Sequence, residues 1–464
     1  MAKPKTIDEL KHSGYKSISI REEMRANLIN KMRAEETLFP GIIGYENTVI
    51  PQLQNAILSG QDIILLGERG QAKSRLIRAL VELLDEEIPV IANCEINDDP
   101  LIPTCISCRE IVKKEKGKTP IKWLNRKERY GEKLATPDIT VADLIGEVDP
   151  IKVAEGRYLA DEYTIHYGLI PRTNRGVFCI NELPDLSERI QVGMFNILEE
   201  KDVQIKGYKV NLPLDIFLIA SANPEDYTNR GRIITPLKDR FGSQIKTHYP
   251  QTIEHEIAVM DQEVKLIKDS GINVQVPQYI KEIVAEFTHL ARRSGEINQR
   301  AGVSVRVSIG NYQTVIANSI RRSLLAGEKD ATPRISDFDY INASTLGKIE
   351  LESIEDGRES KIVNELRKKA ILNVFNQHFN IHDFDGLIGR FDEGLTIETG
   401  ALMGSKLISD WGKDLKDLKG GQTTLKVGRK LSAQASAIEF ILEGLHLSRK
   451  LNKDQNGDGI KYRG

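Results

Sequence analysis

The stretch that decides the fold is "GQDIILLGERGQAKSRLIRALVELL", residues 60–84. Its apolar run at residues 63–66 is short, β-branched and bounded by glycines, which is typical of a buried parallel strand. A glycine-containing loop follows at residues 67–72. Leu76, Ile77 and Leu80 then recur at helical spacing. A strand, a glycine loop and a helix in this order predict an α/β sandwich with a parallel sheet.

The loop and the start of the helix read "GERGQAKS", which is close to the phosphate-binding pattern G-x-x-x-x-G-K-[ST]. In such a loop backbone N–H groups and a lysine hold the phosphates, a hydroxyl ligates Mg²⁺, and the helix N-terminus attracts the same anion. Ala72 replaces the last glycine, which is tolerable if the backbone there is already helical, because only a positive φ strictly needs glycine. The alternative is a chance glycine turn with an exposed lysine. The expected nucleotide contacts are Gly67, Glu68, Arg69, Gly70, Gln71, Ala72, Lys73 and Ser74.

Two more buried strands are predicted at residues 177–180 and 216–220, with a helix at 187–200 and a hairpin turning at 206–207 between them. The first strand ends in Asn181 and Glu182, where nucleoside triphosphatases place a Mg²⁺ ligand and the group that activates water. Glu182 is the candidate base. Asn181 offers a carbonyl without charge, and with Ser74 it is the candidate Mg²⁺ ligand. The alternative is that Asn181 and Glu182 only cap the next helix. Asn223, after the last strand, can hold the attacking water.

Long amphipathic helices dominate from residue 251, at 252–270, 277–294, 304–326, 359–379 and 430–450. We therefore expect an N-terminal helical extension at 1–37 and an α/β core at 38–250 with inserts at about 93–130 and 140–170. An all-helical lid at 251–345 and a further helical region at 346–464 follow. The last dozen residues are expected to form a frayed tail.

Taken in order, these motifs resemble those of AAA+ ATPases, in the branch of the magnesium chelatase I subunit and MoxR-type proteins, over residues 38–345. "GIIGYE" resembles the segment that packs on adenine, around Ile43 and Gly44. "TPLKDRFG" is similar to the arginine-finger stretch, and "GVSVRVSIGNYQ" to the start of the lid helix with the sensor-2 arginine. The resemblance places Arg240 at the finger, Arg306 at sensor 2 and Asn223 at sensor 1. The alternative for Arg240 is an ion pair with Asp239 or another local acid.

The resemblance implies ATP and Mg²⁺ as cofactors and a homo-oligomeric ring, expected to be a hexamer. It also implies a partner with a von Willebrand A domain or chelatase-type partner subunits. A nucleic-acid-acting AAA+ protein is one alternative. However, 65 Lys and Arg against 67 Asp and Glu give a net charge of -2, which disfavours nucleic acid. The other alternative is a nucleotide-binding scaffold that hydrolyses ATP only weakly, because the neutral Asn181 would bind Mg²⁺ less strongly than an aspartate. With no transmembrane stretch or secretory signal in the sequence, we expect a cytoplasmic protein.

Two further features carry open alternatives. Cys94, Cys105 and Cys108 have the spacing C-x₁₀-C-x₂-C, which fits a structural metal completed by an aspartate or histidine, a redox sensor, or ordinary thiols. Residues 113–129 are basic and include Trp123, which fits single-stranded nucleic acid or a solvated loop.

Overall fold

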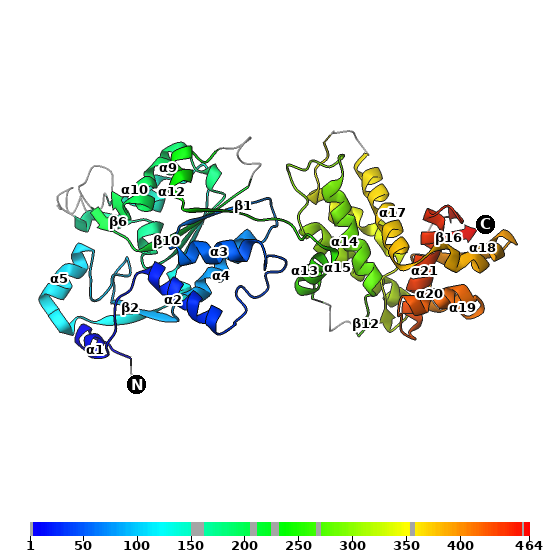
Figure 1. Ribbon diagram of the computed structural model, residues 1–464, viewed down its shortest axis with the longest axis horizontal. Helices are drawn as coiled ribbons and strands as arrows, with labels where there is room; N and C mark the ends of the chain where they lie inside the picture. Colours follow the sequence, from blue (N-terminus) through cyan, green and yellow to red (C-terminus); the bar gives the residue numbers. More distant parts are fainter. Residues whose placement is uncertain are drawn as a thin grey trace. The chain divides into compact units, whose positions relative to one another are not determined.

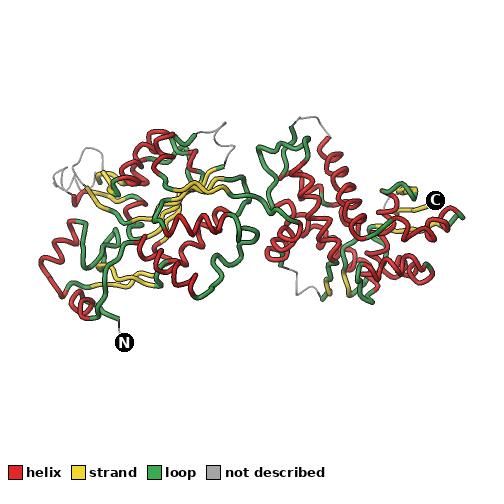
Figure 2. The backbone as a smooth tube through the Cα atoms, viewed as in Figure 1, coloured by secondary structure: helices red, strands yellow, loops and turns green. Residues whose placement is uncertain are grey.

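The computed structural model describes residues 3–149, 162–204, 211–223, 232–265, 271–352, 358–456 and 459–464. The chain forms two compact units, Met1–His248 and Tyr249–Gly464. The first holds most of the strands, and the second is largely helical (Figures 1 and 2).

A five-stranded parallel sheet forms the centre of the first unit, in the order β11-β1-β10-β7-β4. The three predicted strands are confirmed, and the two strands at the edges of the sheet were not predicted. In the register of neighbouring strands Leu66 pairs with Ala222, and Ala220 pairs with Ile180. The carboxyl ends of β1, β10 and β7 therefore meet at one edge. The strands are β1 (Ile63–Leu66), β4 (Tyr130–Leu134), β7 (Gly176–Asn181), β10 (Ile216–Ala222) and β11 (Ser243–Lys246).

Helices cover both faces of this sheet (Figure 1). Alternate residues of a strand point to opposite faces, so Ile63 and Leu65 join one hydrophobic cluster while Ile64 joins the other. The expected parallel sheet with helices is confirmed, although the predicted helix at 187–200 is two helices separated at Met194. One face carries α2 (Ile20–Arg33), α3 (Val49–Leu58) and α4 (Lys73–Ala79), and the other carries α9 (Glu188–Gly193), α10 (Phe195–Glu199) and α12 (Thr235–Arg240).

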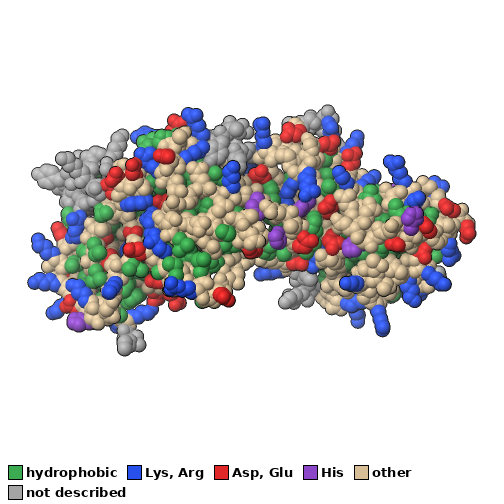
Figure 3. Space-filling model, viewed as in Figure 1, with side chains coloured by type: hydrophobic (Ala, Val, Ile, Leu, Met, Phe, Trp, Pro, Cys, Tyr) green, Lys and Arg blue, Asp and Glu red, His purple; other side chains and the backbone are tan. Residues whose placement is uncertain are grey.

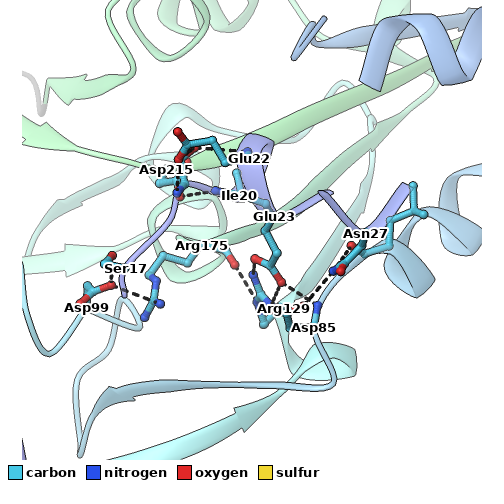
Figure 4. Close-up of polar contacts among 12 residues, drawn as sticks. Ser17, Ile20, Glu22, Glu23, Asn27, Asp85, Asp99, Arg129, Arg175 and Asp215 are labelled. Atoms are coloured by element: carbon cyan, nitrogen blue, oxygen red, sulfur yellow. Dashed lines mark hydrogen bonds and ion pairs between the residues drawn. The ribbon is translucent and has the colours of Figure 1, made fainter. Parts of the chain in front are cut away.

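Buried charges fasten the N-terminal helix α2 to the sheet (Figure 4). Glu23 forms a two-pronged ion pair with Arg129, with N···O distances of 2.7 and 2.6 Å. Arg129 also donates to the carbonyl of Arg175, and Glu23 accepts from the backbone N–H of Asp85. Arg129 directly precedes β4, so the network fixes the edge of the sheet to the first 40 residues.

Short elements fill the predicted inserts. The hairpin at about 202–214 is confirmed as β8 (Asp202–Gln204) and β9 (Asn211–Pro213), paired antiparallel. Its expected turn at 206–207 lies outside the described residues, as do residues 150–161 of the second insert. The other elements are α1 (Ile7–His12), β2 (Glu87–Ile91), α5 (Ile106–Glu115), β3 (Ile121–Asn125), α6 (Val141–Leu144), β5 (Gly146–Val148), β6 (Ile165–Tyr167) and α8 (Leu169–Arg172).

A helix is present in the second unit at each of the five predicted positions, although α13 ends at Glu263 and residues 266–270 of the helix predicted at 252–270 lie outside the described residues. One hydrophobic cluster runs from Ile257 to Tyr462, and the domain boundary near 345 stays a prediction. Among the helices of the described part of the chain, none has both the length and the apolar character that a bilayer span requires. The helices are α13 (Ile253–Glu263), α14 (Gln278–Arg293), α15 (Arg306–Ala326), α16 (Asn342–Thr345), α17 (Arg358–His378), α18 (Asp385–Asp392), α19 (Ser405–Asp414), α20 (Lys416–Thr424) and α21 (Leu431–Leu447).

The second unit is not all-helical, and the expectation of a frayed tail is wrong. The C-terminal strands β15 (Asn452–Asn456) and β16 (Gly459–Arg463) form an antiparallel sheet with β14 (Thr396–Gly400). Ile460 and Tyr462 alternate into the core, and the Tyr462 hydroxyl donates to Glu443 over 2.6 Å. A second small sheet pairs β12 (Asn273–Val274) with β13 (Asp330–Ala331).

Candidate functional site

The predicted phosphate loop connects β1 to α4, and its backbone is tightly constrained. A Cβ at Gly67 would overlap Thr247 Oγ1 and Gln71 Oε1, so a larger residue there would displace these side chains. Ala72 has φ 55° and ψ 16°, in the left-handed region. The condition for an unstrained alanine, a backbone that is already helical, is therefore not met, and the alanine carries the strain that glycine avoids.

Lys73 begins α4 and its side chain is only 8% exposed. Its ammonium donates to the carbonyl of Gly67, to that of Glu68 over 2.9 Å, and to Asn223 Oδ1 over 2.6 Å. The charge is thus buried against three oxygens, and the lysine does not have the exposed position that a chance turn would give it.

Asn223 joins this lysine to the candidate base. Its amide donates to Glu182 Oε2 over 2.7 Å, while its oxygen accepts from Lys73. Glu182 follows the last residue of β7 with φ 55°, and its backbone N–H donates to Ser221 Oγ over 3.3 Å. The structure therefore brings together three predicted site residues from different elements, because β1, β10 and β7 end at the same edge of the sheet.

Asn181 contacts an acid that sequence reasoning missed. Its amide donates to Glu132 Oε1 over 2.6 Å, and its oxygen accepts from Ser221 over 3.1 Å. Glu132 lies on the edge strand β4 and also pairs with Arg78 of α4, at 3.1 and 3.2 Å. Burial alone would raise the pKa of Glu132, but the hydrogen bonds from Arg78, Tyr130 and Asn181 outweigh it and lower that pKa. A carboxylate charge thus stands beside the neutral Asn181.

The segment around Ile43 and Gly44 is tied to the loop by Tyr45, a residue that the motif reasoning did not single out. The buried Tyr45 hydroxyl lies 2.8 Å from the carbonyl oxygen of Gln71 and 2.7 Å from that of His248. Burial raises the pKa of Tyr45 to about 12, which keeps it a neutral hydrogen-bond donor. Ile43 is half-buried, and its adenine contact stays a prediction.

The loop's remaining residues are placed for access to solvent. Ser74, the predicted hydroxyl ligand, is exposed in the first turn of α4. Arg69 is exposed at the tip of the loop, and Gly70 has φ 75°, a conformation suited to glycine. Their contacts with nucleotide stay predictions.

The two predicted arginines lie in different units. Arg240, at the end of α12, pairs with Glu199 at 2.7 Å and stacks 4.3 Å from the ring centroid of Phe195. Arg306 is exposed at the first residue of α15, in the second unit. Their roles as finger and sensor stay predictions.

Relatives of this chain include two proteins named magnesium-chelatase subunit ChlI. That of Nostoc sp. is 25% identical over 355 residues, 70% of this chain and 88% of the relative. That of Synechocystis sp. is 26% identical over 370 residues, 72% of this chain and 95% of the relative. The chain resembles the magnesium-chelatase I subunits. The predicted resemblance to this branch of AAA+ ATPases is thereby confirmed.

The chain was also compared with protein-family models and with solved structures. No family model matches the chain. A solved chain from a complex between subunits BchI and BchD of magnesium chelatase gives a TM-score of 0.37 at 19% identity, covering 71% of this chain and 98% of that one. A score this low carries no argument about fold, which rests on the strand order.

Proposed function

We propose that this chain binds and hydrolyses ATP as a subunit of an AAA+ ring that acts on a partner protein. The observation that carries the proposal is the hydrogen-bonded series Lys73–Asn223–Glu182 at the carboxyl edge of the sheet. It couples a buried cation at the start of a helix to a carboxylate two strands away. Nucleoside triphosphatases need these two groups, one on the phosphates and one on the attacking water.

The residues of the loop fit a triphosphate with Mg²⁺. Gly70 has a positive φ that lets the loop turn, and the N-terminus of α4 and Lys73 supply positive charge. Ser74 and Asn181 would hold the cation, and Glu132 contacts Asn181. When bound, Mg²⁺ neutralises charge on the β- and γ-phosphate oxygens. Glu182 then accepts a proton from water, and Asn223 keeps that carboxylate oriented.

The experiment that tests nucleotide binding is isothermal titration of ATP into the wild type and Lys73→Ala. The variant should lose measurable binding, because it removes the cation from a site otherwise made of backbone dipoles. Lys122→Ala, which removes an exposed lysine of β3, is the matched control and should bind as the wild type does. Equal affinity of Lys73→Ala and the wild type would refute the phosphate site.

The ring is proposed from the AAA+ resemblance together with the position of Arg240. Its partner Glu199 is 57% exposed, and breaking such a surface pair costs about 1 kcal/mol or less. An arginine acting on a neighbouring subunit's phosphate can be worth 10³ to 10⁵ in rate, roughly 4–7 kcal/mol. The ion pair by itself is therefore weaker than the gain at the neighbouring site, and Arg240 would also leave the Phe195 ring and the Pro236 carbonyl.

Mixing variants tests this shared site. Arg240→Ala should bind ATP yet fail to hydrolyse it, and so should Glu182→Gln. A mixture of the two should regain partial activity, since some interfaces then combine an intact base with an intact finger. If Arg240→Ala alone hydrolyses ATP at the wild-type rate, the finger acting between subunits fails.

The partner is proposed to carry a von Willebrand A domain or to be a chelatase-type subunit, with metal insertion or protein maturation as the output. Pull-down with and without ATP, followed by identification of the proteins that co-purify, tests this proposal.

Binding of nucleic acid is disfavoured because Trp123 already makes contacts within the protein. Its N–H donates to the carbonyl of Pro4, and Lys3 covers its ring. On the face seen in Figure 3, side chains of both charges are interspersed.

A further inference from the structure

Three cysteines and an aspartate from the first insert converge on one point. Cys94 lies in the loop after β2, Asp98 follows four residues later, and Cys105 and Cys108 lie at the start of α5. Their sulfur and carboxylate atoms all lie within 4.8 Å of one another. In Figure 1, β2 and α5 lie at the margin of the first unit, away from β1 and its phosphate loop.

The cluster is enclosed. Cys105 and Cys108 are 5% and 2% exposed, Asp98 is fully buried, and Cys94 is partly buried. The three thiols and the carboxylate therefore face one another inside the protein and not in solvent.

Backbone amides point at the sulfurs. The N–H groups of Ile96 and Asp98 each donate to Cys94 Sγ over 3.4 Å, and that of Cys108 donates to Cys105 Sγ over 3.4 Å. Cys105 is also the N-cap of the ten-residue helix α5, so the helix start fixes the positions of Cys105 and Cys108 relative to each other. These donors fix the directions of the Cys94 and Cys105 sulfurs, as hydrogen bonds to metal ligands commonly do.

Asp98 retains the capacity to act as a fourth ligand. Its carboxylate accepts from the Thr104 hydroxyl and from the backbone N–H groups of Thr104 and Cys105, at 3.0 and 2.9 Å for the latter two. An ionised carboxylate has about four acceptor sites, so one is left. The three bonds hold the carboxylate in place against the sulfurs.

We propose that Cys94, Asp98, Cys105 and Cys108 form a structural site for zinc. With metal–sulfur bonds of about 2.3 Å, a tetrahedron has edges of about 3.8 Å, so ligand atoms within 4.8 Å need only small side-chain rotations to close on the ion. Soft thiolate ligands in a tetrahedral set select zinc over Mg²⁺ or Ca²⁺. With four protein ligands the site has no open position, so its role is to hold structure.

The loop between β2 and α5 needs such a fastening. It contains little regular structure, and Asn93 and Asn97 both have positive φ, 61° and 54°. Zinc would tie both ends of this loop together and thereby order the first insert. A redox pair of Cys105 and Cys108 explains the observations less well, because it leaves Cys94 and Asp98 without a role and its sulfurs are buried from a reductant.

Metal analysis of the purified full-length chain tests the proposal. We expect about one zinc per chain by mass spectrometry after gel filtration. Protein produced with Co²⁺ should show thiolate-to-cobalt charge-transfer absorption of a tetrahedral site. No bound metal, with all four cysteines titrating as free thiols in denaturant, would overturn the site. Metal-free protein with two fewer titratable thiols would identify a disulfide instead and overturn it equally.

Variants identify the ligands. Cys108→Ser and Asp98→Asn should each weaken zinc by at least about tenfold in competition with a chelator, and Asp98→Asn should also shift the cobalt spectrum. Cys179→Ala is the matched control, because this buried thiol lies in β7 and should keep full zinc content. Unchanged affinity in Asp98→Asn would refute the four-ligand set. The wild-type zinc content decides the proposal even if Cys108→Ser fails to fold.

Discussion

The buried ion pair between Glu23 and Arg129 makes a strong prediction about stability. The side chains are 4% and 1% exposed, and two short N···O contacts join them. Glu23→Gln keeps the shape of the side chain but leaves the Arg129 guanidinium buried without its anion. Removing one partner of such a pair costs about 3–5 kcal/mol. For a unit of this size about 2–4 °C of melting temperature is lost per kcal/mol, so the Tm should fall by about 6–20 °C.

The assay is urea and thermal unfolding of the full chain, followed by circular dichroism. Glu36→Gln is the control, because the Lys31–Glu36 pair beside the same helix is exposed and should cost less than about 1 kcal/mol. The double variant Glu23→Leu with Arg129→Met should be more stable than Glu23→Gln, since no lone charge remains buried. A loss below about 1 kcal/mol for Glu23→Gln would refute the account of how α2 is fastened to the sheet.

Three further predictions follow from individual residues. Ala72→Gly should stabilise the protein by up to about 1 kcal/mol in urea unfolding, because relief of left-handed strain exceeds the entropic cost of glycine. The control Ala79→Gly, at a right-handed position of the same helix, should destabilise the protein. Equal losses of unfolding free energy in the two variants would contradict the strain at Ala72. Asn181→Asp places a second carboxylate against Glu132, so it should lower the Tm measured in the presence of a chelating agent, and adding Glu132→Gln should restore that Tm. The same substitution should lower the Mg²⁺ concentration needed for ATP binding. An unchanged Tm would exclude the like-charge contact. Burial alone would raise the pKa of Glu256, but His289, Arg292 and Ser308 lower that pKa below its ordinary value of about 4.5. The ionised Glu256 should therefore stabilise the protein fully above about pH 4.5, and this stabilisation should be lost as the pH falls below that value. The difference in unfolding free energy between wild type and Glu256→Gln should shrink over the same fall in pH, and a constant difference would refute the prediction.

Sequence reasoning found the central strands and missed the edges of the sheet for one physical reason. β1, β7 and β10 are covered on both sides and read as continuous apolar runs. β4 and β11 lie at the two edges and read "YGEKL" and "SQIK", because edge strands are partly exposed and carry polar residues. Glu132 lies on one of these edge strands, so its contact with Asn181 could not be predicted from the sequence.

In the candidate sites, too, short sequence motifs indicate some of the residues and not others. Lys73, Glu182 and Asn223 follow strands in short motifs, and the parallel sheet brings them together. Tyr45 and Asp98 contact their partners through loops whose path no motif indicates. The C-terminal hairpin could have been predicted from the alternation of Ile460 and Tyr462 after the glycine-containing stretch "NGDG", a pattern typical of a strand that follows a turn.

The measurement that tests the central claim most directly is single-turnover hydrolysis of ATP by Glu182→Gln, with binding measured on the same preparation. Asn223 can still hold the glutamine, so ATP affinity should stay close to that of the wild type. Loss of the base should slow hydrolysis by about 10²- to 10⁴-fold. Hydrolysis at the wild-type rate would contradict the assignment of Glu182 as the base, and with it the proposed catalytic role of the Lys73–Asn223–Glu182 series.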